Sequence, residues 1–269
     1  MTGLPKISVV TPSFNQARFL ERTIRSVLDQ GYPNLEYIII DGGSTDGSQE
    51  IIRRYSSQVA YWVSEPDRGQ ADAINKGLQR ATGDWIAWQN SDDVYYPGAF
   101  AYLARASDRH READLLIGNI MLIDEEDRVI RDIRYVRPTF ESLLAEGMVL
   151  TNQAAFWRRS VHQRIGLLKE SLSCAFDYDW FLRLLEQGQG AHVDCFFGGY
   201  RVHGNTKTSL IAERCTEERK AVLGERGLPP LRIRYYRLRR MALLLANGNL
   251  YYVVRGLLQR AFGIQRKLL

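Results

Sequence analysis

The sequence predicts an α/β protein with a mixed, mostly parallel sheet and flanking helices, followed by a basic helical C-terminal tail. The first half alternates short apolar runs with stretches of helical periodicity, in the order strand, helix, strand. This rhythm is typical of a doubly wound sheet. The residues after 228 carry nine basic and no acidic side chains, which sets the tail apart from the rest.

The first half of the chain contains four predicted strands. Residues 7–11 form a β-branched run closed by Pro12, and residues 35–40 form a continuous apolar run typical of a strand buried on both faces. Further strands are predicted at residues 59–63 and 85–88. Helices are predicted at residues 20–28, ending at Gly31, and at 46–55 and 71–81. Asp46 would begin the second helix through a capping box, so a cap role is favoured for it.

The pattern loosens after Pro97, and the later elements are predicted more sparsely. Residues 114–123 and 129–136 read as a hairpin around the acidic turn 124–127. Helices are expected at 139–146 and 177–187, a strand at 192–197, and a helical tail from Leu231.

Composition excludes several classes of protein. With 269 residues, 45% hydrophobic and 25% charged, the chain is an ordinary globular protein of one large or two small domains. Three cysteines without CxxC spacing argue against a disulfide framework or a zinc site and suit a reducing compartment. We see no signal sequence and no apolar run approaching the roughly 20 residues of a spanning helix, so a cytoplasmic location is expected.

The net charge of +5 divides into +9 for residues 229–269 and therefore −4 for the first 228. Five arginines fall within nine residues of the tail, beside leucine and tyrosine. This is the composition of a helix lying on an anionic membrane surface, so we expect a peripheral protein. A helical pair packed on the preceding domain or on a second subunit is the alternative.

Acidic residues follow two predicted strands, at the edge where open parallel sheets bind ligands. Asp41 precedes a glycine-rich turn, and it is either a ligand-binding or a turn residue. Asp92 and Asp93 follow the fourth strand side by side. Two adjacent carboxylates repel unless a cation such as Mg²⁺ or Mn²⁺ lies between them, and a solvated turn that carries two acids is the alternative.

Four motifs occur in order: residues 11–16 (TPSFNQ), 40–48 (IDGGSTDGS), 67–77 (DRGQADAINKG) and 90–93 (NSDD). They resemble the motif set of the family 2 glycosyltransferases, inverting enzymes of the GT-A fold that use nucleotide-sugars. The resemblance continues weakly to about residue 210. It implies a catalytic domain at 1–210, with a nucleotide-sugar half (1–95) and an acceptor half (96–210), and an extension at 211–269.

The resemblance implies roles for individual residues. The nucleotide would be bound by Thr11, Pro12, Asp41, Asp67, Asn75 and Asp92. The metal would be held by Asp92, Asp93 or both, because the first acid of the family's Asp-x-Asp motif is Asn90 here. His203 matches a histidine that reaches the metal or diphosphate in some relatives. Arg201 and Lys207 could assist the diphosphate, although exposed positions are favoured for them.

The general base would lie in residues 176–179 (FDYD), and we predict Asp177. Asp179 lies four residues before Arg183 and should pair with it on the outer face of a helix. Asp177 has no charged side chain at that offset, and a helix-capping role is its alternative. The family often has Glu where Phe176 stands.

Acceptor contacts are predicted weakly for Gln153, Trp157 and Trp180, the tryptophans being more often core residues. The expected activity is transfer of a hexose, most simply from a uridine diphosphate sugar, to a hydroxyl of a glycan or lipid-linked glycan in cell-envelope polysaccharide synthesis. Alternatives are a nucleotidyltransferase, a sugar-nucleotide sensor without turnover, and nucleic-acid binding through the tail. We expect no nucleic-acid partner and leave the oligomeric state open.

Overall fold

The computed structural model describes residues 3–204, 212–224 and 226–261 of the chain. Its centre is a nine-stranded sheet in the order β3-β2-β1-β4-β8-β6-β9-β5, with β7 paired to β6. The strands are β1 (Ile7–Ser13), β2 (Leu35–Asp41), β3 (Tyr61–Ser64), β4 (Trp85–Trp88), β5 (Val94–Tyr95), β6 (Leu115–Ile123), β7 (Val129–Ile133), β8 (Ala155–Arg158) and β9 (Gly190–Arg201).

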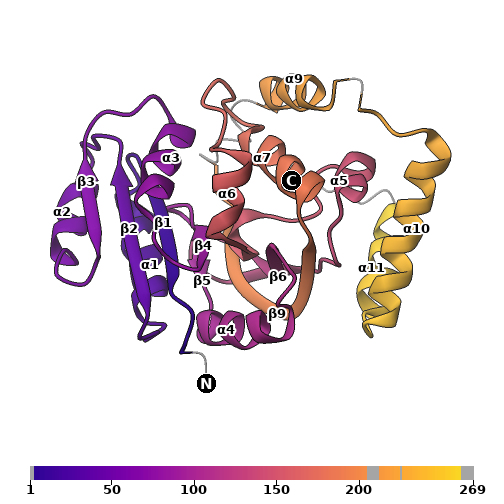
Figure 1. The fold of residues 1–269 in the computed structure, drawn as a ribbon, viewed down its shortest axis with the longest axis horizontal. Coiled ribbons are helices and arrows are strands. Elements are labelled where there is room, and N and C mark those ends of the chain that lie inside the picture. Colours follow the sequence, from indigo (N-terminus) through magenta and orange to yellow (C-terminus); the bar gives the residue numbers. More distant parts are fainter. Residues whose placement is uncertain (1–2, 205–211, 225, 262–269) are drawn as a thin grey trace.

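Helices flank this sheet, and Figure 1 shows them distributed along its length. Among them, α1 contacts α2, and α3 packs on β1 and β2. The helices are α1 (Ala17–Leu28), α2 (Ser48–Arg54), α3 (Gln70–Arg80), α4 (Ala99–Arg109), α5 (Phe140–Glu146), α6 (Arg159–Ile165), α7 (Phe176–Gln187), α9 (Ala212–Leu223), α10 (Pro230–Ala246) and α11 (Leu250–Ala261), with a 3-10 turn η1 (Asn152–Ala154) before β8. The predicted mixed, mostly parallel α/β architecture is confirmed.

The directions of the strands bring the carboxyl ends of five of them to one edge of the sheet. β1 runs parallel to both β2 and β4, and its register places Ser13 beside Asp41. β8 is antiparallel to β4 and to β6, and β6 is parallel to β9. The strands β1, β2, β4, β6 and β9 therefore all end at the same edge of the sheet.

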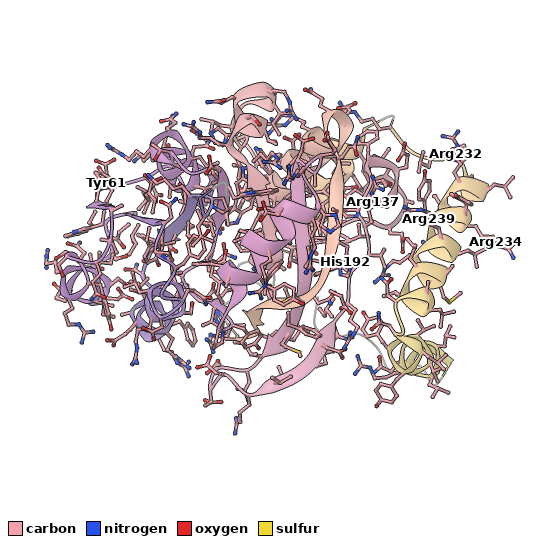
Figure 2. All side chains as sticks on the ribbon, turned by 60° about the horizontal axis from the view of Figure 1, so that its bottom comes forward. Tyr61, Arg137, His192, Arg232, Arg234 and Arg239 are labelled. Atoms are coloured by element: carbon pink, nitrogen blue, oxygen red, sulfur yellow. A yellow bond between two sulfur atoms is a disulfide. The ribbon has the colours of Figure 1, made fainter. Side chains whose placement is uncertain are left out.

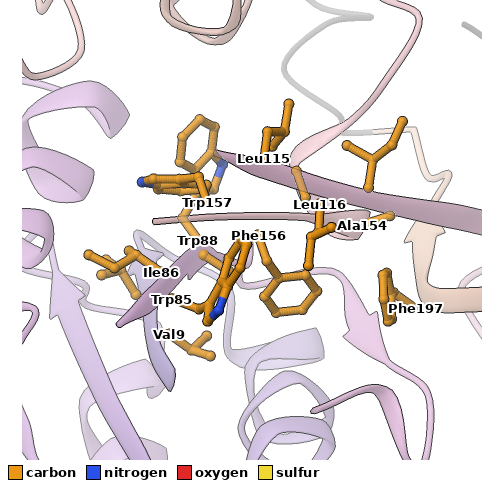
Figure 3. Close-up of a cluster of buried hydrophobic side chains, with 14 of the residues drawn as sticks. Val9, Trp85, Ile86, Trp88, Leu115, Leu116, Ala154, Phe156, Trp157 and Phe197 are labelled. Atoms are coloured by element: carbon orange, nitrogen blue, oxygen red, sulfur yellow. The ribbon is translucent and has the colours of Figure 1, made fainter. Parts of the chain in front are cut away.

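The core lies where β4, β8 and β6 meet the helices (Figure 3). Trp88 has Trp157 and Trp180 at ring-centroid distances of 5.3 and 5.9 Å, and Phe156 lies edge-on to Phe197 at 5.2 Å. All five rings are fully buried. Aromatic packing of this kind holds the strand ends rigidly, which positions the loops that follow them.

The cysteine prediction is wrong. Cys174 and Cys215 form a disulfide, and Cys195 is the free thiol. The bonded pair is separated by 41 residues, and it joins α9 to the segment that precedes α7. The three cysteines therefore give no support to a reducing compartment.

The C-terminal helices α10 and α11 lie side by side at one end of the molecule (Figure 1). Leu244 and Val253 pack against Val136 in a small apolar cluster. Arg240 pairs with Glu146 at 3.5 Å, and the guanidinium of Arg255 lies 2.5 Å from the carboxylate of Asp132. One face of this hairpin is therefore packed on the preceding domain. Within the described ranges, no helix combines the length and apolarity needed to cross a bilayer.

Candidate active site

Asp41 ends β2 at the edge where the strands finish, and its side chain is fully buried. Its carboxylate accepts hydrogen bonds from the Ser44 amide at 2.9 Å, the Ser44 hydroxyl at 2.6 Å and the Ser64 hydroxyl at 2.6 Å. These donors compensate the cost of burying a charge. They also hold the glycine-rich turn against the end of β3.

Asp46 has a larger structural role than a single helix cap. Its Oδ1 accepts from the backbone and hydroxyl of Ser48, at the start of α2. Its Oδ2 accepts from the amide of Ala17, the first residue of α1, at 2.9 Å. The predicted capping box is wrong, because Gly47 is the N-cap residue of α2, but the Asp46 carboxylate still fixes the beginnings of both helices.

Asp67 is placed directly over Gly42. A Cβ on Gly42 would lie 2.3 Å from Oδ2 of Asp67, so only glycine leaves room for this carboxylate. Asp67 Oδ1 also accepts from the Gly69 amide at 2.8 Å. The ring of Phe14 borders the same spot and is 59% exposed. An exposed aromatic beside two buried or fixed carboxylates can stack on a flat ligand, a feature that the residue-by-residue prediction missed although Phe14 lies inside the first motif.

Thr11 and Asn75 make their hydrogen bonds in the protein interior. Thr11 and Pro12 are buried within β1, and the Thr11 hydroxyl lies 3.0 Å from that of Tyr37 in the interior. The Asn75 amide donates to the Leu168 carbonyl and accepts from the Leu168 amide. Asn75 thus ties α3 to the loop before α7. Its role at the nucleotide stays a prediction, with the amide hydrogen-bonded to Leu168.

Asp92 and His203 meet at the end of β4 and β9. Asp92 Oδ2 lies 3.1 Å from Nε2 of His203. His203 packs against Phe19 of α1 at a ring-centroid distance of 4.8 Å. The histidine is largely buried, whereas the Asp92 side chain is 20% exposed. This pair combines two possible metal ligands at the edge where β1, β2 and β4 end.

Asp93 turns the other way, into the protein. Its Oδ1 accepts from the Arg201 amide at 2.8 Å, and its Oδ2 accepts from Gln153 at 2.7 Å and Asn90 at 3.1 Å. Burial first, and then the charge of Asp92, raises the pKa of Asp93 well above its usual range, against the effect of these donors. Both oxygens of Asp93 face protein donors, which favours Asp92 as the metal ligand, and the metal role of Asp93 stays a prediction.

Arg201 is buried, contrary to the exposed position favoured for it. Its guanidinium donates to the carbonyls of Asp92 at 2.7 Å and Asp124 at 2.8 Å, and it pairs with Asp127. The same group lies 5.0 Å from the ring centroid of Phe19. Arg201 therefore joins the loop after β4 to the acidic turn of the β6–β7 hairpin. Lys207 lies outside the described residues.

The donor set fits a divalent cation only in part. Among the residues that the structure describes, no three His, Cys, Asp or Glu side chains converge as a complete ligand set. Asp92 and His203 supply two ligands. Mg²⁺ characteristically takes one or two carboxylates and completes its shell with substrate phosphate and water. The pair therefore fits a cation that is held jointly with a diphosphate.

The two acids of α7 lie in different surroundings. Asp179 accepts from Arg183 Nε at 2.8 Å and from Lys169 Nζ at 2.7 Å, which confirms the pairing with Arg183. Its predicted outer-face position is wrong, because Asp179 is buried. Asp177 is half-buried in the first turn of the helix, where its Oδ1 accepts from the Tyr178 amide at 2.6 Å. The N-cap residue is Ala175, so Asp177 is not the cap.

Glu218 of α9 supports this turn from outside. Its carboxylate accepts from three consecutive amides, those of Ser173, Cys174 and Ala175, at 2.8–3.1 Å. Although burial acts to raise the pKa of Glu218, these hydrogen bonds lower it to about 2. With the neighbouring disulfide, Glu218 fixes the chain that leads into Asp177. Nothing in the sequence pattern marked this residue.

The predicted acceptor residues do not form an exposed surface. Trp157 and Trp180 are fully buried, with their rings 4.6 Å apart. Gln153 is also buried and donates to Asp93. These acceptor predictions are wrong, because the side chains complete the core and the support of Asp93.

The chain resembles known proteins in both sequence and structure. Residues 8–166 match the model of glycosyl transferase family 2. An uncharacterized glycosyltransferase of Mycobacterium tuberculosis is 34% identical over 188 residues, 68% of this chain and 70% of that protein. The putative teichuronic acid biosynthesis glycosyltransferase TuaG of Bacillus subtilis is 42% identical over 94 residues, 34% of this chain and 37% of that protein.

Two solved structures share the fold. S. aureus TarS 1–349 in complex with UDP-GlcNAc superposes with a TM-score of 0.66 and 17% identity, over 81% of this chain and 65% of that one. The mannosyltransferase PcManGT of Pyrobaculum calidifontis, in complex with GDP-Man and Mn²⁺, superposes with a TM-score of 0.64 and 18% identity, over 98% of this chain and 82% of that one.

Proposed function

Because this chain belongs to glycosyl transferase family 2 and is a glycosyltransferase, we propose that it moves a hexose from a nucleoside diphosphate sugar to a hydroxyl of a glycan or lipid-linked glycan. The main support for donor binding is that Asp41, Asp67 and the Asp92–His203 pair lie at the same edge of the sheet. TarS with UDP-GlcNAc and PcManGT with GDP-Man share this fold, which supports a nucleotide-sugar donor.

The nucleoside end of the donor is assigned to the loops after β1 and β2. Phe14 offers an exposed ring for the base, and Asp41 and Asp67 offer carboxylate acceptors for its N–H and for ribose hydroxyls. We assign uridine as the simplest base for this arrangement.

The diphosphate end is assigned to Asp92 and His203. When bound there, Mg²⁺ or Mn²⁺ would neutralise charge on the departing diphosphate and make it a better leaving group. Asp92 and His203 are the residues that would hold the cation, and Arg201 and Asn90 keep the loop beneath them in place.

The acceptor half is assigned to Asp177 as general base. Asp177 would take the proton of the acceptor hydroxyl while the hydroxyl oxygen attacks the anomeric carbon. The bond from that carbon to the diphosphate oxygen breaks, and the nucleoside diphosphate leaves with the electron pair. A single displacement of this kind inverts the anomeric centre. Because TuaG is named for teichuronic acid biosynthesis, we place the acceptor among cell-envelope polysaccharides, assembled at the cytoplasmic face of the membrane.

A mass-spectrometric screen tests the proposal. The full chain is incubated with uridine, guanosine and thymidine diphosphate sugars, with Mn²⁺, with Mg²⁺ and with chelator, and released nucleoside diphosphate is measured. We expect release from one nucleotide class that depends on the cation and is lost in Asp92→Asn. Asp108→Asn, an exposed acid on α4, is the matched control. Cation-independent release, equal in Asp92→Asn and wild type, would contradict the assignment of the diphosphate end.

A further inference from the structure

The outward face of the α10–α11 hairpin is apolar. Most of the large apolar side chains that are exposed in the described residues belong to this hairpin, and Leu231 and Tyr251 are 81% and 76% exposed. The others on the hairpin are Tyr235, Leu238, Leu245, Leu250, Val254, Leu257 and Leu258. The opposite face is the one that packs on Val136. This hairpin is therefore amphipathic with its apolar face outward, the reverse of a helix that only covers a core.

The exposed residues form continuous stripes rather than scattered points. On α10, Leu231, Tyr235, Leu238, Ala242 and Leu245 follow one another at alternating steps of four and three. On α11, Leu250, Val254 and Leu257 repeat the same spacing. Residues at these steps lie on one side of a helix, so each helix presents a single apolar stripe.

Arginines border the stripe of α10 on both sides. Arg232 and Arg239 are seven residues apart along one flank, and Arg234 and Arg237 follow the other. Figure 2 shows Arg234 extending from the outer side of α10. Long basic side chains beside an apolar stripe can bury their stems and keep their charges at a polar boundary.

The positive charge of this face favours an anionic membrane over a second copy of the chain as its binding partner. A second copy of the hairpin would bring arginines against arginines, since residues 229–269 contain no acidic side chain to pair with them. An anionic lipid surface offers phosphate charges to the arginines and an acyl boundary to the stripe. We infer that the α10–α11 hairpin docks the protein on an anionic membrane through the stripe of Leu231, Tyr235, Leu238 and Leu245 and its flanking arginines. This docking does not depend on the proposed reaction.

Co-sedimentation of the full chain with vesicles tests the docking. Vesicles of phosphatidylcholine alone are compared with vesicles that contain phosphatidylglycerol, over a range of NaCl concentrations. We expect binding to the anionic vesicles that falls as salt rises, because screening weakens charge attraction. No binding to anionic vesicles at low salt overturns the proposal.

Two sets of variants separate the apolar and basic contributions. The stripe variant combines Tyr235→Ser, Leu238→Ser and Leu245→Ser, and its control is Val129→Ser with Ile130→Ser, exposed apolar residues of β7. The stripe variant should bind about tenfold more weakly or worse, and the control should bind as wild type. Equal losses in both would overturn the assignment of this face.

The charge variant combines Arg232→Gln, Arg234→Gln and Arg237→Gln. Its control carries the same charge change at Arg25, Arg53 and Arg105, all exposed on other helices. Each arginine at an anionic surface raises the binding affinity roughly fivefold. The charge variant should therefore bind anionic vesicles on the order of 100-fold more weakly than the wild type, and the control should bind nearly as well as the wild type. Light scattering of wild type and stripe variant completes the test. If the wild type is a dimer and the stripe variant is a monomer, the face binds a second copy of the chain and the membrane proposal is overturned.

Discussion

Asp92 Oδ2 lies 3.1 Å from Nε2 of His203, although 111 positions separate the two residues in the chain. The contact exists because β4 and β9 end at the same edge of the sheet. In addition Arg201, which precedes His203 by two residues, donates a hydrogen bond to the Asp92 carbonyl and so brings the two loops together. A carboxylate and an imidazole are thereby held together beside the loops assigned to the nucleotide.

The first prediction concerns this pair. Asp92→Asn keeps the shape of the side chain and removes its charge, and His203→Gln removes the imidazole. Each should weaken cation-dependent binding of the nucleoside diphosphate about 10- to 100-fold, the usual scale for disturbing a metal site. Titration calorimetry with and without Mn²⁺ measures the effect, with Asp108→Asn as control. Equal affinity in the presence and absence of the cation for wild type would refute the assignment.

A second prediction separates the two acids of α7. Asp177→Asn should lower kcat by roughly 10² or more while leaving donor affinity and stability near wild type, because a general base acts in the chemical step. Single-turnover kinetics and donor titration measure this. If the variant turns over normally in a folded protein, Asp177 is not the base.

Asp179→Asn should act on stability instead. Its carboxylate is buried and serves both Arg183 and Lys169, so the substitution removes the charge that both cations share, although Arg183 keeps the carbonyls of Ile165 and Leu167. Removing one member of a buried pair costs about 3–5 kcal/mol, which urea denaturation would detect. Loss of turnover without loss of stability would show that the roles of the two acids are reversed.

The parallel half of the sheet was predictable because buried strands produce continuous apolar runs. Residues 35–40 are such a run, and they form β2 almost as expected. The helix α4 was not predicted, since its buried face consists largely of small residues such as Ala104 and Ser107, which give a weak periodic signal. β8 has four residues, too few for a period of two to be distinguished from helical spacing.

Side-chain direction at the site could not be predicted from neighbouring residues. Asp92 and Asp93 are adjacent acids in a turn, and local sequence treats them alike. Gln153 and Arg201 decide which one faces inward, from 60 and 108 positions away. Burial of Trp157 and Trp180 has the same origin, because it depends on how α7 packs over β4 and β8.

A third prediction uses the close approach of Asp67 to Gly42. Gly42→Ala should displace the Asp67 carboxylate, because the new Cβ would lie 2.3 Å from Oδ2. Nucleotide affinity should fall by about tenfold, the value of roughly one charge-assisted hydrogen bond. Gly256→Ala, which meets nothing within 4 Å, is the matched control. If Gly42→Ala binds the nucleotide as tightly as the wild type, the assignment of Asp67 to the nucleotide site is contradicted.

A fourth prediction concerns Arg201. Arg201→Lys cannot reach the carbonyls of Asp92 and Asp124 and the carboxylate of Asp127 together, because one ammonium lacks the fork of a guanidinium. The free energy of unfolding should fall by about 2–4 kcal/mol. Arg128→Lys, an exposed arginine of the same turn, should leave the free energy of unfolding close to that of the wild type. Similar losses in both variants would argue against the central role of Arg201.

The last prediction is a pH dependence that belongs to Glu218. Its pKa is lowered from 4.5 to about 2 in the folded protein, where burial is outweighed by the amides of Ser173, Ala175 and Cys174. A carboxyl group with a lowered pKa stabilises the fold fully above the unfolded pKa, near 4.5. As the pH falls from there to about 2, the unfolded chain takes up the proton first, so this contribution is lost. Glu218→Gln should therefore be less stable than wild type at neutral pH, and the gap should shrink across that window. Chemical denaturation of both proteins from pH 7 to 2 measures the gap, and Glu217→Gln, the exposed neighbour on α9, should show none. A gap that stays constant with pH would mean that the substitution acts through packing and not through the charge that holds the entrance of α7.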